Sequence, residues 1–317
     1  LYRIGGKTWQ QDVDKERGNY DYLMGADVDT DNPTVREELS RWRHWYIDTT
    51  ELDGFRLDAV KHISASFYKA WLADMRAYAG RELFAVGEYW HQDVNVLLDY
   101  LGKVDFSMSL FDVPLHQHFH EISRGNGQFD MSRLFEGTLV GARPDLAVTF
   151  VDNHDVPRLA SILTDKSCLR PAYGMLFGMP GIPCVYYGSE WGIAGEKGGP
   201  DGDWALRPAL DTPAPNELTA FVTQLAHLRS ADDAAARALN YGAYRNVVIQ
   251  NKQLLFERAC DDATVLVAVN AVNEPYTFGA GELSGSFVDL LADDAPTVEL
   301  SGSLELAPYE VRYLLRA

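Results

Sequence analysis

The stretch Gly54-Phe55-Arg56-Leu57-Asp58-Ala59-Val60-Lys61-His62 decides the fold, because it joins an apolar strand to charged residues and then to a helix. Its apolar run, 55–60, is followed by a segment in which Phe67, Trp71 and Met75 recur at helical spacing. Strands that are nearly continuous in apolar residues are typical of parallel sheets buried on both faces.

The same strand–helix unit recurs on both sides of this stretch. Further apolar runs, each followed by a helical pattern, are 83–86, 106–110, 147–151 and 182–187. Upstream, Asn32 and Pro33 predict the start of an extra helix. Its apolar stripe consists of Val35, Leu39, Trp42 and Tyr46. We therefore predict an α/β fold with five parallel strands.

The pattern of apolar residues changes near residue 238. Alternating segments separated by turn residues follow, at 246–250, 254–258 and 264–270, and they predict antiparallel strands in a small β-sandwich. Residues 1–31 are polar and show no sustained period. We expect three parts: 1–31, a parallel α/β part at 32–238, and a C-terminal sandwich at 239–317.

Composition excludes several classes of protein. The chain has 317 residues and a formal net charge of −18, and an acidic surface repels phosphate backbones, so we expect no nucleic-acid partner. No apolar run approaches the roughly 18 residues that a membrane helix needs, so we expect no membrane partner. Three cysteines, odd in number and far apart, exclude a disulfide scaffold or a zinc ribbon.

Carboxylates follow three of the predicted strands. Asp58 ends the first, Glu88 the second, and the segment 152–155, with Asp155, the third of these. In parallel α/β folds active sites form at the carboxyl ends of strands. Glycosidic cleavage needs one carboxylate to attack and one carboxylic acid to protonate the leaving oxygen. Each residue alone is equally well explained as a turn former or a helix cap.

Three stretches in this order resemble the α-amylase family, glycoside hydrolase family 13. They are the opening stretch, then Gly87-Glu88-Tyr89-Trp90, then Phe150-Val151-Asp152-Asn153-His154-Asp155. The resemblance implies a (β/α)8 TIM barrel that cleaves α-1,4-glucosidic bonds in starch, glycogen or maltooligosaccharides. It implies a retaining mechanism with a covalent glycosyl-aspartate intermediate.

The resemblance also implies a role for each matching residue. Asp58 would be the nucleophile, Glu88 the general acid and then base, and Asp155 the third carboxylate, which orients sugar hydroxyls. The implied substrate-binding residues are Arg56, which positions Asp58, and Lys61, His62, Trp90 and His154.

The chain departs from the family pattern in two respects, the number of barrel strands present and the set of calcium ligands. The likeness of residues 19–29 to the end of the family's B domain implies that strands 4–8 of the barrel are present and strands 1–3 are missing. We expect an upstream region or another chain to supply them, and the fragment alone to be inactive. The family's structural calcium would be held by Asp21, Asp27 and the carbonyl oxygen of His62, although one expected asparagine ligand belongs to the missing part.

Other patterns leave alternatives open. His116, His118 and His120 alternate like metal ligands, but we expect a loop there, with solvent-facing or cleft-lining side chains. A glucanotransferase of the same family shares every carboxylate, and an inactive glucan-binding fragment is the alternative from another class. The sequence leaves cytoplasmic and secreted locations equally open.

Overall fold

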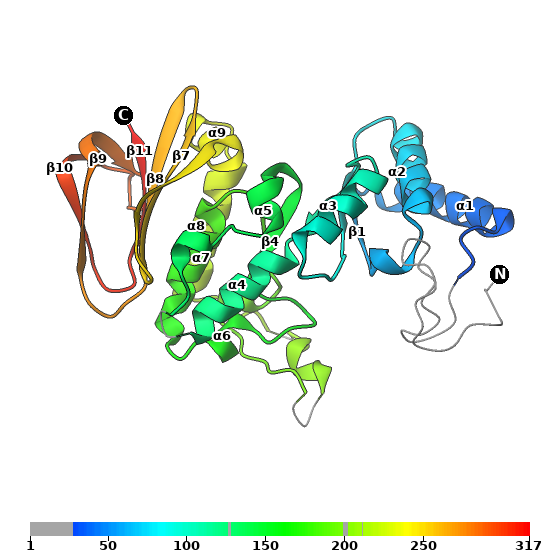
Figure 1. Ribbon diagram of the computed structural model, residues 1–317, viewed down its shortest axis with the longest axis horizontal. Helices are drawn as coiled ribbons and strands as arrows, with labels where there is room; N and C mark the ends of the chain where they lie inside the picture. Colours follow the sequence, from blue (N-terminus) through cyan, green and yellow to red (C-terminus); the bar gives the residue numbers. More distant parts are fainter. Residues whose placement is uncertain (1–27, 126–127, 199–201, 211) are drawn as a thin grey trace. The chain divides into compact units, whose positions relative to one another are not determined.

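The computed structural model describes residues 28–125, 128–198, 202–210 and 212–317. The chain divides into two compact units (Figure 1). The first unit comprises Leu1–Pro114, Gly137–Leu139 and Leu146–Val148, and the second comprises Leu115–Glu136, Val140–Asp145 and Thr149–Ala317.

A five-stranded sheet has its strands in chain order. Its members are β1 (Gly54–Leu57), β2 (Phe84–Gly87), β3 (Ser109–Phe111), β4 (Ala147–Phe150) and β5 (Ile182–Cys184). The ladders from β1 through β2 and β3 to β4 are parallel, as predicted. Each strand is shorter than its apolar run or begins later, because the chain turns away once it leaves the ladder.

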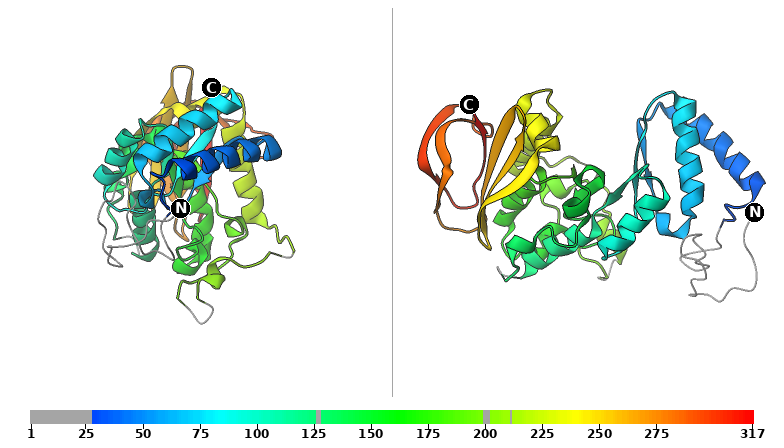
Figure 2. Two further views of the ribbon diagram at one scale, coloured as in Figure 1. Left: turned by 90° about the vertical axis from the view of Figure 1, so that its right-hand side faces the viewer. Right: turned by 45° about the horizontal axis from the view of Figure 1, so that its top comes forward.

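Helices α1 (Pro33–Thr50), α2 (Ala65–Ala79) and α3 (Val94–Lys103) belong to the first unit, and α1 lies against α2 (Figure 2). The predicted start of α1 is confirmed, since the Asn32 side chain accepts a hydrogen bond from the Thr34 N–H at 3.0 Å. The predicted stripe is wrong in one position. Arg43 is buried and ion-paired to Asp74, whereas Trp42 is 46% exposed.

The remaining helices of the parallel part differ most from prediction. The segment 131–140, part of the helical pattern expected after the run 106–110, contains only the short 3-10 helix η3 (Met131–Arg133) and the start of α5 (Leu139–Ala142). The loop expected around the three histidines is helix α4 (Val113–Arg124). His116 is buried there with its ring stacked on Phe150 at 4.8 Å, contrary to the solvent-facing position expected. Other helices are α6 (Leu159–Ile162), α7 (Leu169–Gly178), α8 (Glu217–Ser230) and α9 (Ala234–Tyr241).

The C-terminal strands form one antiparallel sheet in the order β10-β9-β11-β8-β7-β6. Their bounds are β6 (Ala243–Ile249), β7 (Gln253–Cys260), β8 (Ala263–Asn270), β9 (Tyr276–Asp289), β10 (Thr297–Leu306) and β11 (Val311–Arg316). Antiparallel pairing is as predicted, but a single hydrogen-bonded sheet replaces the expected two-sheet sandwich. The sheet curls so that apolar side chains from β7 to β11, including Leu266, Phe287 and Leu306, share one core (Figure 2).

Helix α7 packs on the outer face of this sheet through its glycines. A Cβ built on Gly174 would come within 2.7 Å of both Val311 methyl groups, so only a glycine leaves room for the strand. The Tyr313 hydroxyl donates to the Gly174 carbonyl at 2.6 Å. Buried Arg258 donates to the Gly178 carbonyl at 2.9 Å. Side chains of the sheet therefore pack directly against the backbone of α7.

Candidate active site

Adjacent parallel strands place Asp58 and Glu88 at the same end of the sheet. Leu57 pairs with Gly87 across β1 and β2, and the Glu88 N–H continues that ladder by donating to the Leu57 carbonyl at 2.9 Å. Because each carboxylate residue comes directly after its strand, both lie at the carboxyl ends of the strands. Both residues belong to the first unit.

Arg56 connects the two carboxylates. Its guanidinium bonds Asp58 through Nη1 and donates to Glu88 Oε2 through Nη2 at 3.2 Å. The Asp58 side chain is 77% exposed, whereas that of Glu88 is 13% exposed. One carboxylate is thus open to an incoming ligand, and the other is largely withdrawn from water beside the same positive charge.

The backbone conformation of Ala59 also helps to hold Glu88 in place. Ala59 has φ 45° and ψ 46°, a left-handed conformation that is costly for a residue with a Cβ. This turn directs the Ala59 N–H to Glu88 Oε2 at 3.2 Å, while the Val60 N–H donates to the Glu88 carbonyl at 3.0 Å. Ala59 therefore holds the carboxylate of Glu88, and the next residue, Val60, holds the Glu88 carbonyl.

The other residues expected in the first unit lie nearby. The Lys61 ammonium donates to the Trp90 carbonyl at 3.4 Å, which ties the segment after β1 to the segment after β2. His62 ends the 3-10 helix η2 (Val60–His62). Tyr68 on α2, which sequence reasoning missed, is buried, and burial followed by the nearby Asp58 charge raises the pKa of its hydroxyl. Its helical spacing indicated only a core position.

Asp155 and His154 lie in the second unit, where they contact each other. His154 Nε2 is 3.3 Å from an Asp155 carboxylate oxygen. Arg207 bonds the other oxygen of Asp155 and donates from Nε to the His154 carbonyl at 3.1 Å. Arg207 was missed by sequence reasoning because nothing in its local sequence signals a partner 52 residues away.

Asp152, in the middle of the same motif, supports this loop from the protein interior. It is buried and accepts hydrogen bonds from the Leu159 N–H at 2.8 Å and the Ser189 hydroxyl at 2.9 Å. Burial raises the pKa of Asp152 above its ordinary value, while these hydrogen bonds lower it. Ser189 in turn accepts from buried Arg158 at 2.9 Å. The contacts of Asp152 are structural.

Of the three expected metal ligands, the structure describes only His62, because Asp21 and Asp27 lie outside the described residues. Across residues 28–125, 128–198, 202–210 and 212–317, no group of three or more His, Cys, Asp or Glu side chains is placed to hold a metal ion. In the same ranges no helix has the length and apolar character needed to cross a membrane.

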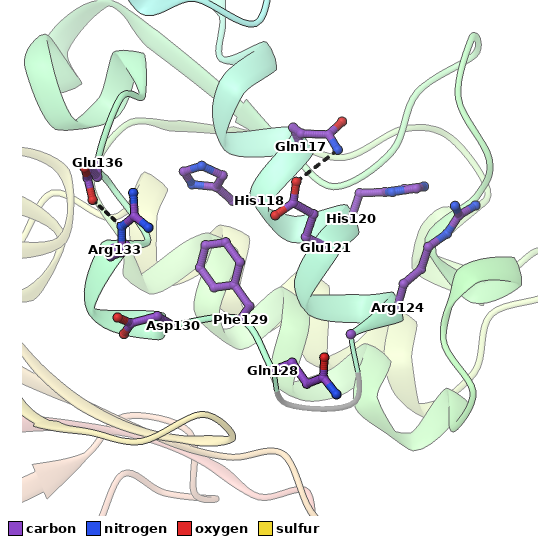
Figure 3. Close-up of a pocket in the computed structure, with 11 residues that line it drawn as sticks. Gln117, His118, His120, Glu121, Arg124, Gln128, Phe129, Asp130, Arg133 and Glu136 are labelled. Carbon is purple, nitrogen blue, oxygen red and sulfur yellow. Dashed lines mark hydrogen bonds and ion pairs between the residues drawn. The ribbon is translucent and has the colours of Figure 1, made fainter.

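A separate hollow in the second unit lies along α4. Its volume is about 780 Å³, and Figure 3 shows His118, Glu121, Phe129 and Arg133 around it. His118 donates from Nδ1 to the Leu134 carbonyl at 2.8 Å, and its ring centroid lies 5.1 Å from that of Phe129. None of the predicted catalytic residues lines this hollow.

Known proteins similar to this chain include α-amylases and cyclomaltodextrin glucanotransferases. It is 51% identical over 195 residues to the α-amylase of Geobacillus stearothermophilus, covering 61% of this chain and 36% of that protein. It is 31% identical over 289 residues to the cyclomaltodextrin glucanotransferase of Niallia circulans, covering 87% of this chain and 38% of that protein. The chain thus spans well under half the length of these relatives.

Solved structures agree on the fold. The crystal structure of an Anoxybacillus α-amylase matches with a TM-score of 0.79 and 26% identity, covering 93% of this chain and 66% of that one. An α-amylase of Geobacillus thermoleovorans, crystallised with acarbose, matches with a TM-score of 0.82 at 23% identity, covering 98% of this chain and 71% of that one. Residues 2–246 match the family described as alpha amylase, catalytic domain. The chain therefore belongs to the α-amylase family, with its TIM-barrel-type fold and a C-terminal antiparallel sheet.

Proposed function

We propose that the protein containing this chain is a retaining glycosidase that hydrolyses α-1,4-glucosidic bonds in starch, glycogen or maltooligosaccharides. The observation that carries the proposal is the single guanidinium of Arg56 bridging Asp58 and Glu88 at the ends of neighbouring parallel strands. A double displacement at a sugar carbon requires two carboxyl groups at the reacting bond, one to attack and one to donate a proton.

In the proposed mechanism the carboxylate of Asp58 attacks the anomeric carbon while Glu88 gives its proton to the departing glycosidic oxygen. A glycosyl ester on Asp58 results. Glu88, now ionised, takes a proton from water, and the water oxygen attacks the anomeric carbon and releases Asp58. A retaining enzyme places the two carboxyl groups about 5–5.5 Å apart, and we expect that separation here.

The remaining roles are proposed from the family motif. Asp155 would bind sugar hydroxyls and help to distort the ring, and His154 would bond the sugar in the cleavage subsite. Lys61, His62 and Trp90 would contact sugars on the leaving-group side. The hydrogen bond from Lys61 to Trp90 supports a shared surface for the last group.

The five-stranded sheet is proposed to be the later part of an eight-stranded barrel, its strands 4–8. In support, β1 and β5 are the end strands of the described sheet, and closure of a barrel removes such edges. Strands 1–3 would come from an upstream region or from another chain. We expect activity only where the barrel is complete.

Calcium fits the chemistry of the donor set that the family implies. The carboxylates of Asp21 and Asp27 and the carbonyl oxygen of His62 are hard oxygen donors, which calcium prefers. They are fewer than the roughly six to eight oxygens it takes, so other ligands would complete the site. The ion would stabilise the loop at His62, and no step of the reaction is assigned to it.

Asp58→Asn and Glu88→Gln in the protein as encoded by its whole reading frame test the proposal. We expect each variant to lower kcat on soluble starch by about a thousandfold or more, because each removes a group that acts on the reacting bond. Asp53→Asn is the matched control, since Asp53 precedes β1 and its side chain is 93% exposed. Full activity in either active-site variant would overturn the assignment.

A glucanotransferase is the second candidate, because the Niallia circulans relative of that name matches 87% of this chain. Both activities begin with the same glycosyl ester and differ in whether water or a sugar hydroxyl attacks it. Incubation with maltoheptaose separates them: hydrolysis gives only shorter chains, whereas transfer also gives longer or cyclic products.

A further inference from the structure

The turn η7 (Asp203–Leu206) exposes a tryptophan to solvent and buries the leucine that ends the turn. Trp204 is 78% exposed, whereas Leu206, two residues later, is fully buried. Single exposed apolar side chains are common on proteins. Two features make Trp204 of interest: hydrogen bonds from the protein interior fix its turn, and the turn is linked to Asp155.

Three contacts fix the backbone of the turn. The Leu206 carbonyl accepts from Arg158 at 2.9 Å and from the Tyr186 hydroxyl at 3.2 Å. On the other side, a Cβ built on Gly195 would lie 2.3 Å from the Ala205 carbonyl oxygen, so the two backbones touch. Arg158 is itself fully buried. The indole is therefore carried by a rigid turn.

The same turn is joined to the third carboxylate. The Arg207 N–H closes the turn on the Trp204 carbonyl at 3.0 Å, and the Arg207 guanidinium bonds Asp155 and the His154 carbonyl. Trp204 is thus one 3-10 turn away from a residue that contacts Asp155.

We propose that Trp204 is the platform of a glucose-binding subsite next to Asp155, on which one pyranose ring of an α-glucan stacks. The C–H bonds on one face of a pyranose are slightly positive and suit the negative face of an indole. A rigid indole with only two side-chain torsions loses little entropy when it binds. The inference deepens the proposed function and rests on it for the identity of the ligand.

Trp204→Ala tests the subsite in the whole protein, with Trp204→Phe as the conservative variant. Tyr241→Ala is the control, since Tyr241 is 85% exposed at the end of α9. On maltoheptaose we expect Trp204→Ala to raise KM roughly three- to tenfold with kcat within about twofold, because stacking is lost equally from substrate and transition state. The phenylalanine variant should be intermediate and Tyr241→Ala unchanged.

Binding measured without turnover separates this inference from the proposed function. In an Asp58→Asn background, tryptophan fluorescence should change on titration with maltoheptaose, and adding Trp204→Phe should weaken or abolish that change. If the unsubstituted protein hydrolyses no glucan, the proposed function fails, and the titration still decides the subsite. If Trp204→Ala matches Tyr241→Ala in KM, or if the two titrations coincide, the subsite is overturned.

Discussion

At the scale of single residues, Arg56 shows what a sequence can and cannot predict about this site. A strand places residues i and i+2 on one face, so the two-residue spacing of Arg56 and Asp58 predicts that their side chains lie side by side. The second bond, from Arg56 to Glu88, joins residues 32 apart and depends on the ladder between β1 and β2. The residues around Arg56 in the sequence therefore do not predict its contact with Glu88.

Buried His116 predicts an acid-sensitive step in stability. Burial, and secondly the charge of nearby His120, lower the pKa of His116 from 6.5 to about 4. Below pH 6.5 the unfolded chain binds a proton that the folded protein excludes. The stability contributed by neutral His116 is therefore complete above that pH and is lost as pH falls towards 4, by roughly 3 kcal/mol at most.

Urea unfolding at pH 7, 6, 5 and 4 checks this. His116→Phe keeps an aromatic ring against Phe150 and should flatten the fall in unfolding free energy over this range. His227→Gln, at an exposed position on α8, should leave the fall unchanged. Parallel curves for wild type and His116→Phe would contradict the prediction.

At the scale of elements, the sequence predicted those whose apolar residues repeat in one period. Helix α2, in which Phe67, Trp71 and Met75 are buried at helical spacing, is of this kind, and the parallel strands were predicted from their apolar runs. Helix α4 was missed because its alternating histidines conceal a stripe in which Val113, His116 and Phe119 are buried at helical spacing. The single C-terminal sheet was missed because alternation predicts strands but not which strands pair.

Two glycines in helices should respond to alanine with opposite signs. Gly102 in α3 has nothing within 4 Å of a built Cβ, so Gly102→Ala should stabilise the protein by about 0.5–1 kcal/mol through helix propensity. Gly174 in α7 faces Val311, so Gly174→Ala should destabilise by roughly 1–3 kcal/mol through overpacking. Thermal unfolding of both variants measures the difference, and equal shifts would mean that α7 does not contact the sheet so closely.

At the scale of the whole molecule, the proposed calcium site predicts a dependence of stability on metal. In the protein with its whole reading frame, calcium at about 100 times its Kd should add roughly 3 kcal/mol to the unfolding free energy. EDTA should lower Tm accordingly. Asp27→Asn should remove most of the calorimetric heat of calcium binding, whereas Asp31→Asn, which changes an acid paired with Arg36, should keep it. An unchanged titration in Asp27→Asn would remove that residue from the site.

The arrangement around Arg56 has a consequence for the energetics of the proposed cycle. Before attack, Asp58 carries the one negative charge and Glu88 is neutral. After attack, the ester at Asp58 is neutral and Glu88 carries the charge. A guanidinium bonded to both oxygens therefore faces the same total charge at every stage. This cation can therefore stay in place as the negative charge passes from one carboxylate to the other, and its reorientation adds nothing to the barrier of either half of the reaction.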